Sequence, residues 1–129
     1  MAALNSSRMA VDEALTKLDP EPLKKSYSGD ALRLNVDAIR RFREEGAESV
    51  GLDYRAIRID GIDIFKNPLH ARVRETVEKT FTILQEGKCE RTNPFESKIT
   101  IYLKQANAGA WLIYAVDEDS SNPSYVPCS

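Results

Sequence analysis

The sequence is short of the residues that mark several classes of protein. It has two cysteines, one histidine and one tryptophan among 129 residues. Two cysteines are too few for a disulfide-rich scaffold. Cys89 and Cys128 also lie too far apart for a zinc-binding pair, whose cysteines are about two to four residues apart. The residues leave open a Cys89–Cys128 bridge or two free thiols.

Long apolar runs are missing too, and neither sign of charge dominates. No stretch approaches the roughly 18 apolar residues of a membrane-spanning helix, and residues 1–14 lack the apolar centre of a signal peptide. The sequence therefore predicts a cytoplasmic protein without direct membrane contact, unless a leader or anchor was removed ahead of Met1. Lys and Arg number 18 against 20 Asp and Glu, so bulk charge predicts no binding to nucleic acid.

What is present is the composition of an ordinary folded domain. The sequence is 42% hydrophobic and 29% charged, and its length suits one domain of about 100–150 residues. We expect a single domain over residues 1–118. Residues 119–129 are polar and contain proline, which predicts a loose C-terminal tail.

The first third of the sequence has the apolar spacing of helices. Residues 10–18 predict a first helix, which the prolines within 19–22 end, and 23–27 predict a short helical piece. Over residues 30–45 the apolar side chains recur at helical spacing opposite a charged face. Gly46 then stands at the position after a helix where glycine is favoured.

The rest of the sequence is rich in strand formers. Residues 54–65 alternate apolar and polar side chains, and Gly61 interrupts the alternation in the manner of a bulge. Residues 72–84 fit a helix or a strand, but their many β-branched side chains favour a strand. Residues 99–104 alternate again, and 111–116 form an apolar run typical of a covered strand.

Helices that precede four successive antiparallel strands indicate an α+β fold. We expect the N-terminal helices to pack on one face of a bent, four-stranded antiparallel sheet. A loop is predicted over residues 86–94, and a hairpin turn at residues 107–109.

This pattern resembles the nuclear transport factor 2-like (cystatin-like cone) superfamily. Within it, the sequence is most similar to the intermembrane-space domain of plastid-division proteins and its bacterial relatives. The resemblance implies helices across a strongly bent sheet, shaped as a cone, with a pocket at its open end. It rests on four segments: residues 18–46, 54–60, 72–83 and 98–116.

The strand over residues 72–84 carries the most suggestive polar side chains. If its apolar residues face inward, Glu75 and Lys79 share their face, because side chains repeat every two residues along a strand. Buried charges are costly unless they are paired or line a cavity. Together with Tyr54, Tyr102 and Trp111, they could line the pocket that the resemblance implies. Alternatively, a bulge flips the register, or both residues lie at solvated strand ends.

Other candidate sites are unconvincing. His70 stands alone in a turn, and Asp60 and Asp63 are what a solvated strand with a bulge would carry. Residues 117–128 imitate the start of a calcium loop, but they lack its glycine and its final glutamate. The arginines within 40–43 are offset by neighbouring acids. We therefore predict no catalytic residues, no metal site and no cofactor.

The leading interpretation is a non-enzymatic binding or assembly module that engages a protein or peptide through its bent sheet or the mouth of the cone. It follows from the resemblance to assembly domains and from the lack of a convincing catalytic pair. One alternative is a small isomerase or dehydratase-type enzyme with an apolar pocket that uses Glu75. Another is a purely structural domain of a membrane-anchored protein. Many relatives dimerise through the sheet face, so the resemblance also allows a homodimer.

Overall fold

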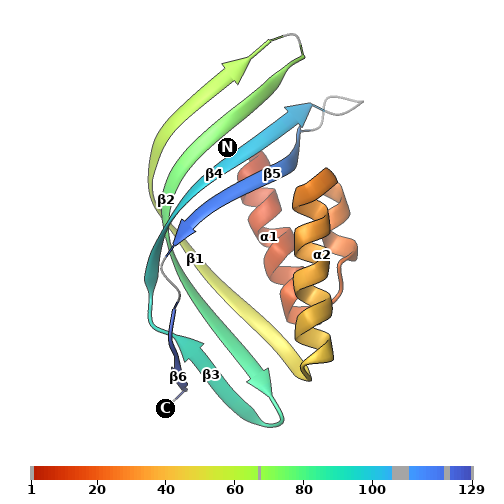
Figure 1. Ribbon diagram of the computed structural model, residues 1–129, viewed down its shortest axis with the longest axis vertical. Helices are drawn as coiled ribbons and strands as arrows, with labels where there is room; N and C mark the ends of the chain where they lie inside the picture. The colour runs from red at the N-terminus through yellow and green to blue at the C-terminus, as the bar shows by residue number, and fades with distance from the viewer. Residues whose placement is uncertain (1, 67, 106–110, 121–122, 129) are drawn as a thin grey trace.

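The structure, a computed structural model, describes residues 2–66, 68–105, 111–120 and 123–128. Within these ranges, two α-helices joined by a short 3-10 helix precede six strands (Figure 1). The elements are α1 (Ala2–Lys17), η1 (Glu21–Lys25), α2 (Gly29–Glu44), β1 (Ala47–Phe65), β2 (His70–Gln85), β3 (Lys88–Thr92), β4 (Phe95–Gln105), β5 (Trp111–Ser120) and β6 (Tyr125–Pro127).

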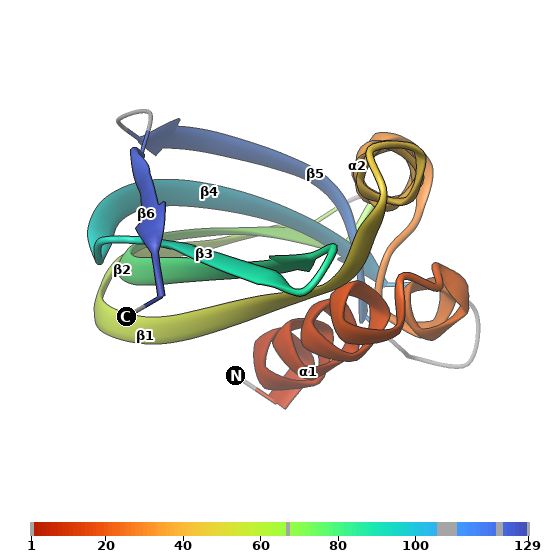
Figure 2. The same cartoon turned by 90° about the horizontal axis from the view of Figure 1, so that it is seen from below.

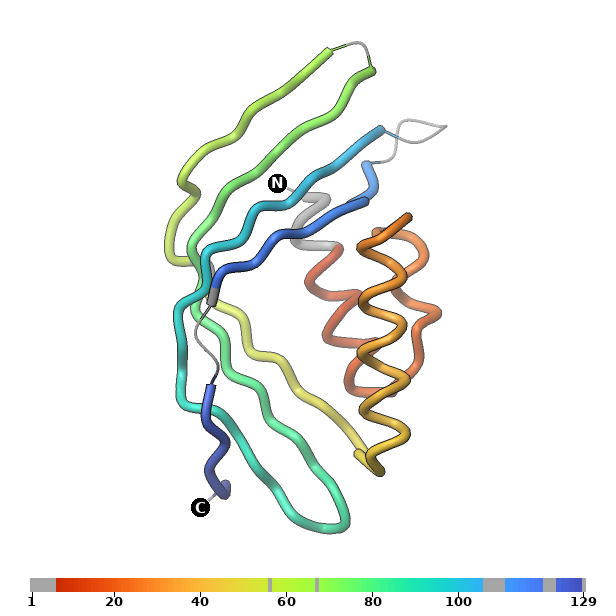
Figure 3. Tube along the Cα trace, viewed as in Figure 1, coloured from red at the N-terminus to blue at the C-terminus, as the bar shows by residue number. Residues whose placement is uncertain are grey.

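The strands form one antiparallel sheet that curves around the helices (Figure 2). One edge of β2 pairs with β1. Its other edge pairs with β4 over residues 70–79 and with β3 over residues 82–85. β4 continues to β5, and β3 continues to β6. Both helices lie on the concave face, whereas the hairpin ends of β1 and β2 reach beyond them (Figure 3).

The predicted α+β architecture is confirmed, but the sheet has six strands rather than four. β3 lies where a loop was predicted. Glu86 and Gly87 both have positive φ, at 51° and 75°, and form the tight two-residue connection from β2 to β3. A connection of this kind needs positive φ and returns the chain directly alongside the strand it has left. The predicted turn at 107–109 lies outside the described residues.

A disulfide bond fastens the last strand to the sheet. Cys89 in β3 is bonded to Cys128, and the Cys128 N–H also donates to the carbonyl oxygen of Cys89 at 3.0 Å. β6 pairs with β3 just before this point. Of the two states that the sequence left open for the cysteines, the structure has the bridge.

β1 is a long strand with one irregularity near its start, between Ala47 and Ser49, and two bulges farther along. Its register against β2 shifts between Ala56 and Arg58 and again between Ile59 and Gly61, so the predicted interruption at Gly61 is confirmed. A side chain at Gly61 would come within 2.4 Å of the Arg74 guanidinium. Glycine therefore lets Arg74 lie across the strand at the bulge.

The core lies between the helices and the concave face of the sheet. α2 ends as predicted, with Gly46 at φ +86°. The helical side chains that point toward the sheet meet the inward side chains of β2, β4 and β5. The fully or nearly fully buried apolar residues are Ala14, Leu15, Leu18, Leu23, Tyr27, Ala31, Ile39, Val50, Ala71, Val73, Val77, Ile99, Ile101, Leu103 and Ile113.

The helices of the described ranges are too short or too polar to cross a membrane.

Candidate functional site

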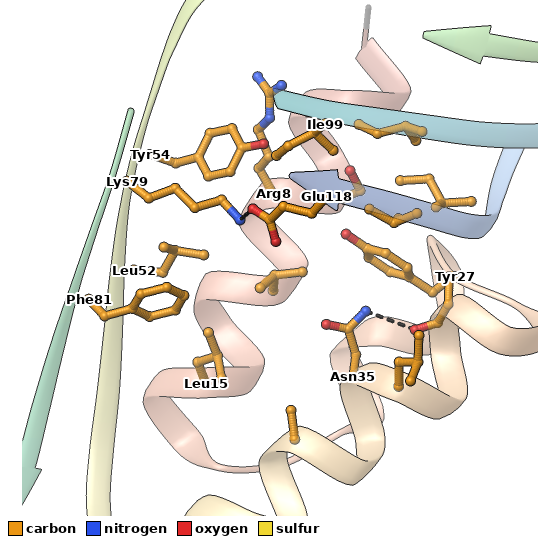
Figure 4. Close-up of a pocket in the computed structure, with 18 of the residues that line it drawn as sticks. Arg8, Leu15, Tyr27, Asn35, Leu52, Tyr54, Lys79, Phe81, Ile99 and Glu118 are labelled. Atoms are coloured by element: carbon orange, nitrogen blue, oxygen red, sulfur yellow. Dashed lines mark hydrogen bonds and ion pairs between the residues drawn. The ribbon is translucent and has the colours of Figure 1, made fainter. Parts of the chain in front are cut away.

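The concave face of the sheet holds a cavity of about 430 Å³ beneath α1 and α2 (Figure 4). This volume falls within the range of about 300–1,000 Å³ that is usual for ligand sites. Most of the wall is apolar. The lining residues are Ser7, Arg8, Val11, Leu15, Tyr27, Ala31, Leu34, Asn35, Ala38, Phe42, Leu52, Tyr54, Lys79, Phe81, Ile99, Ile101, Ile113, Val116 and Glu118.

The wall follows from the periodicity of each element. On α2, the lining residues fall within Ala31–Phe42 at spacings of three or four, which keeps them on one side of the helix. On β4, Ile99 and Ile101 alternate with exposed or half-buried polar residues and point inward. Asn35 is the polar exception on α2, and its side-chain amide donates to the Ala31 carbonyl at 2.9 Å. The middle of the cavity is therefore apolar.

The two helices rest on different strands, which leaves a groove between them. α1 packs mainly on β1, and α2 packs on β5. Residues from both helices line the cavity, and Leu34 of α2 lines it while 57% of its surface is exposed. The cavity thus reaches the surface beside α2, with an apolar side chain at its rim.

One end of the cavity carries a buried ion pair. Arg8 of α1 donates to Glu75 of β2, and Glu75 is only 2% exposed. The hydroxyl of Tyr54 donates to the same carboxylate at 3.3 Å. The Arg8 guanidinium carbon lies 4.5 Å from the centre of the Tyr54 ring, close enough for a cation–π contact. Glu75 is therefore held on the inner face of β2 by two donors.

A second ion pair lies beside the first. Lys79 of β2 donates to Glu118 of β5, and the two side chains point toward each other in Figure 4. The Ser97 hydroxyl donates to the same Glu118 oxygen at 2.7 Å. The Lys79 ammonium lies 5.5 Å from the centre of the Tyr54 ring. Tyr54 thus contacts a cation from each of the two pairs, and the four charges cancel.

The environment of this polar end shifts two pKa values. Burial and the adjacent charge of Glu75 raise the pKa of the Tyr54 hydroxyl well above its ordinary value. Burial opposes the charge of Arg8, but the hydrogen bond and the attraction to Glu75 outweigh it and raise the Arg8 pKa. Both shifts favour a neutral tyrosine beside an ionised Arg8–Glu75 pair.

The structure brings together part of the predicted set. Tyr54 and Lys79 line the cavity, and Glu75 is buried next to it, behind Arg8. Trp111 is half-buried against the core but does not contribute to the described lining. Tyr102 lies on the convex face, where its hydroxyl donates to Asp117 at 3.4 Å. It pairs with Arg72 of β2, which alternates with the inward-facing Val73.

Sequence reasoning missed Arg8 and Glu118, the partners of the two predicted charges. A signal for each was present. Arg8 stands three residues before Val11 and seven before Leu15, so it lies on the apolar face of α1. Glu118 stands two residues after Val116 and therefore shares its strand face.

The other candidates have ordinary partners. The Nδ1 atom of the half-buried His70 lies 2.7 Å from the Pro68 carbonyl oxygen. Asp60 accepts from Arg58 and Thr76, which lower its pKa, and Asp63 accepts from Arg72. The described part of the chain contains no cluster of three or more potential metal ligands.

Comparison with known proteins places the fold. No family model and no curated protein matches the sequence. Among solved structures, the intermembrane space region of the chloroplast protein ARC6 is similar over 93% of both chains, with a TM-score of 0.73 and 14% identity. The chain has the cone fold of nuclear transport factor 2-like proteins.

Two further structures share this cone fold. A type 2 hexachlorocyclohexane dehydrochlorinase (LinA) is similar over 99% of this chain and 88% of its own, with a TM-score of 0.61 and 8% identity. A ketosteroid isomerase-like protein from Erwinia carotovora atroseptica is similar over 95% of this chain and 96% of its own, with a TM-score of 0.55 and 16% identity. At these identities the likeness concerns the fold alone. The cone fold accommodates an enzyme as well as the region of a chloroplast protein, so function has to be argued from the site.

Proposed function

We propose that the chain is a non-enzymatic binding module in which the groove between α1 and α2 takes the apolar side chains of a protein or peptide partner. The observation that carries the proposal is the cavity of about 430 Å³, whose wall is mostly apolar, which side chains of both helices line and which reaches the surface at Leu34. Grooves of this kind bind amphipathic segments through a few apolar anchors.

The rim of the groove favours a macromolecular partner over an enclosed small molecule. Leu34 projects from α2 with more than half of its surface exposed, although it also lines the cavity. A chain lying along the groove would cover Leu34 and place an anchor in the cavity at the same time. Binding energy in interfaces concentrates in anchors that fill such buried pockets, and the contacts around them exclude water.

The charges at the end of the cavity support binding rather than catalysis. A general base must reach its substrate, and its pKa is usually tuned toward the working pH. Glu75 is almost completely buried behind Arg8 and accepts hydrogen bonds from Arg8 and Tyr54. Lys79 is occupied by Glu118. An isomerase or dehydratase that uses Glu75 would first have to displace Arg8.

A peptide selection tests this proposal. We expect peptides selected from a random phage-displayed library to carry apolar anchors, and Leu34→Lys, which charges the rim, to weaken them at least about tenfold. Ala38→Trp, which fills the cavity, should do the same. Arg41→Trp is the matched control, because Arg41 is exposed on α2 outside the described lining. Affinities would be measured by fluorescence anisotropy with synthetic peptides.

Two results would overturn the proposal. One is a set of selected peptides that bind the unaltered chain and all three variants with equal affinity. The other is turnover of a small apolar substrate that Glu75→Gln abolishes and Leu34→Lys leaves intact, which would establish the enzyme alternative.

A further inference from the structure

The outer half of β1 is an unpaired strand edge with an apolar face. β1 pairs with β2 along one edge, and within the described residues no strand pairs with the other edge. Ile57, Ile59, Ile62 and Ile64 all lie in this half, and between 39% and 65% of each is exposed. Free edges with apolar side chains readily add another strand, so natural proteins usually protect them.

Apolar and charged side chains of this edge lie on opposite faces of the sheet. Ile59 and Ile62 pair with Glu75 and Val73 of β2, which are buried on the concave face. Arg58 pairs with Thr76 and lies on the opposite, convex face. Asp63 shares the convex face, where it accepts from Arg72. Apolar side chains therefore mark one face of the edge and charges mark the other.

The segment 57–64, Ile-Arg-Ile-Asp-Gly-Ile-Asp-Ile, is complementary to itself when two copies run antiparallel. If the symmetry axis passes between Asp60 and Gly61, Arg58 faces Asp63 of the second copy and Ile59 faces Ile62 of the second copy. We propose that two copies of this chain pair their 57–64 segments edge to edge, about this axis, and so join their sheets into one.

The bulge at Asp60, between Ile59 and Gly61, is what permits this register. Opposed residues of an antiparallel pair must point to the same face, and in a regular strand an odd and an even position point to opposite faces. The extra residue at Asp60 reverses the alternation, so that Ile59 and Ile62 share a face. The symmetry axis passes through the bulge, so the alternation of side chains is reversed at the same point in both copies. Arg58 and Asp63 then meet on the convex face, and Ile59 and Ile62 meet on the concave face.

The centre of the proposed interface is complementary as well. Asp60 would face Gly61 of the second copy, and the Arg74 guanidinium fills the space where a Gly61 side chain would stand. Asp60 of each copy therefore approaches Arg74 of the other. Both side chains lie on the convex face, because Asp60 accepts from Thr76 and Arg74 pairs with Gly61. No charged residue stands directly opposite a residue of like charge in this alignment, and the two Asp60 side chains that flank the axis each lie beside an Arg74 guanidinium.

The proposed interface is short. Eight residues span about 27 Å of strand, so the buried area falls at the low end for specific complexes. We therefore expect a reversible dimer with a dissociation constant in the micromolar range. A second copy is the partner that fits because an unrelated strand would not place a cation opposite Asp63 and an anion opposite Arg58.

The first test is the oligomeric state. Sedimentation velocity over about 5–500 µM should show a monomer–dimer equilibrium for the unaltered chain. Ile62→Lys places a charge in the centre of the apolar row and should raise the dissociation constant at least about tenfold. Met9→Lys is the matched control, since Met9 is 73% exposed on α1, outside the 57–64 segment. A chain that stays monomeric at 500 µM, or a dimer that Ile62→Lys does not weaken, overturns the proposal.

The second test fixes the register by charge exchange. Arg58→Glu places two like-charge contacts in its own dimer, and Asp63→Lys does the same. Mixed together, the two variants regain opposite charges at both contacts, so native mass spectrometry should show more heterodimer than either homodimer. A mixture with no excess of heterodimer overturns this register. Circular dichroism checks that each variant is folded. If Asp63→Lys does not fold, the sedimentation test with Ile62→Lys still decides the proposal.

Discussion

At the scale of single residues, the buried carboxylate of Glu75 depends on one cation. Removing Arg8 would leave Glu75 charged and nearly inaccessible to water, and losing one partner of a buried pair is strongly destabilising. Because 24% of the Arg8 side chain is exposed, we expect Arg8→Met to lower the free energy of unfolding by about 2 kcal/mol, below the full cost of a buried pair.

Urea denaturation would measure this loss. Arg55→Met is the control, since the Arg55–Glu78 pair is exposed and should contribute less than about 0.5 kcal/mol. Adding Glu75→Gln to Arg8→Met should recover part of the loss, because the unpaired buried charge is then gone. Equal effects of Arg8→Met and Arg55→Met would contradict this account.

Because the pKa of the Tyr54 hydroxyl is raised, we expect the free energy of unfolding to depend on pH in the alkaline range. Its pKa is raised in the folded chain by burial and by Glu75, whereas the unfolded chain ionises near pH 10. The stabilising contribution of neutral Tyr54 is therefore complete below pH 10 and is lost as the pH rises beyond it. We expect unfolding free energies to fall more between pH 9 and pH 11 for the unaltered chain than for Tyr54→Phe. Parallel declines in the two proteins would contradict the prediction.

For each of the two ion pairs that the cavity holds at its polar end, the sequence analysis identified only the residue on β2. The alternation along residues 72–84 was enough to place Glu75 and Lys79 on an inner face. Their partners come from α1 and β5, which are 67 residues and 39 residues away in sequence. Their meeting depends on how the helix lies over the sheet, which local periodicity does not specify. Tyr102 fell on the wrong face of this site because a strand alternates strictly, and Tyr102 lies between the inward-facing Ile101 and Leu103.

At the scale of elements, the C-terminal strand depends on the disulfide bond. β6 has only three residues and pairs with the five-residue β3, so pairing alone is weak. The Cys89–Cys128 bond joins residues 39 apart, and a loop of that length contributes about 4 kcal/mol in the chain-entropy model. We expect the Cys89→Ser, Cys128→Ser variant to lose about 2–4 kcal/mol of unfolding free energy.

Thermal and urea unfolding with and without a phosphine reductant would check this. The reductant should bring the unaltered chain to the stability of the serine variant and leave that variant unchanged. A reductant that lowers the stability of both proteins equally would show that it acts elsewhere.

The elements that the sequence predicts well are those with long periodic patterns. α2, with Gly46 after its end, and the bulged β1 agree with their patterns. β3 and β6 could not be predicted in this way, because they are short and mostly exposed and so carry no apolar alternation. β3 follows from the turn at Glu86 and Gly87, and β6 from its bond to β3.

At the scale of the whole molecule, the cavity and the free edge of β1 lie in different places. The cavity lies beneath the helices, whereas the exposed isoleucines lie in the outer half of β1, toward its connection to β2. The end of the β1–β2 hairpin reaches beyond the helices (Figure 3). We therefore expect Ile62→Lys to weaken association between copies without changing the affinity of cavity-bound peptides. Fluorescence anisotropy with the selected peptides would check this, and a large loss of affinity in Ile62→Lys would show that the two sites are coupled.

The disulfide bond also determines how the molecule carries mechanical tension between its two ends. A pull on the C-terminal end passes from Cys128 straight to Cys89 and then along β2 and β1, because a covalent bond is the stiffest route. The 38 residues between the cysteines, which include β4 and β5, lie outside that route. These two strands supply Ile99, Ile113 and Glu118 to the wall of the cavity. Under tension, that side of the cavity would keep its shape while β1, β2 and the helices bear the strain.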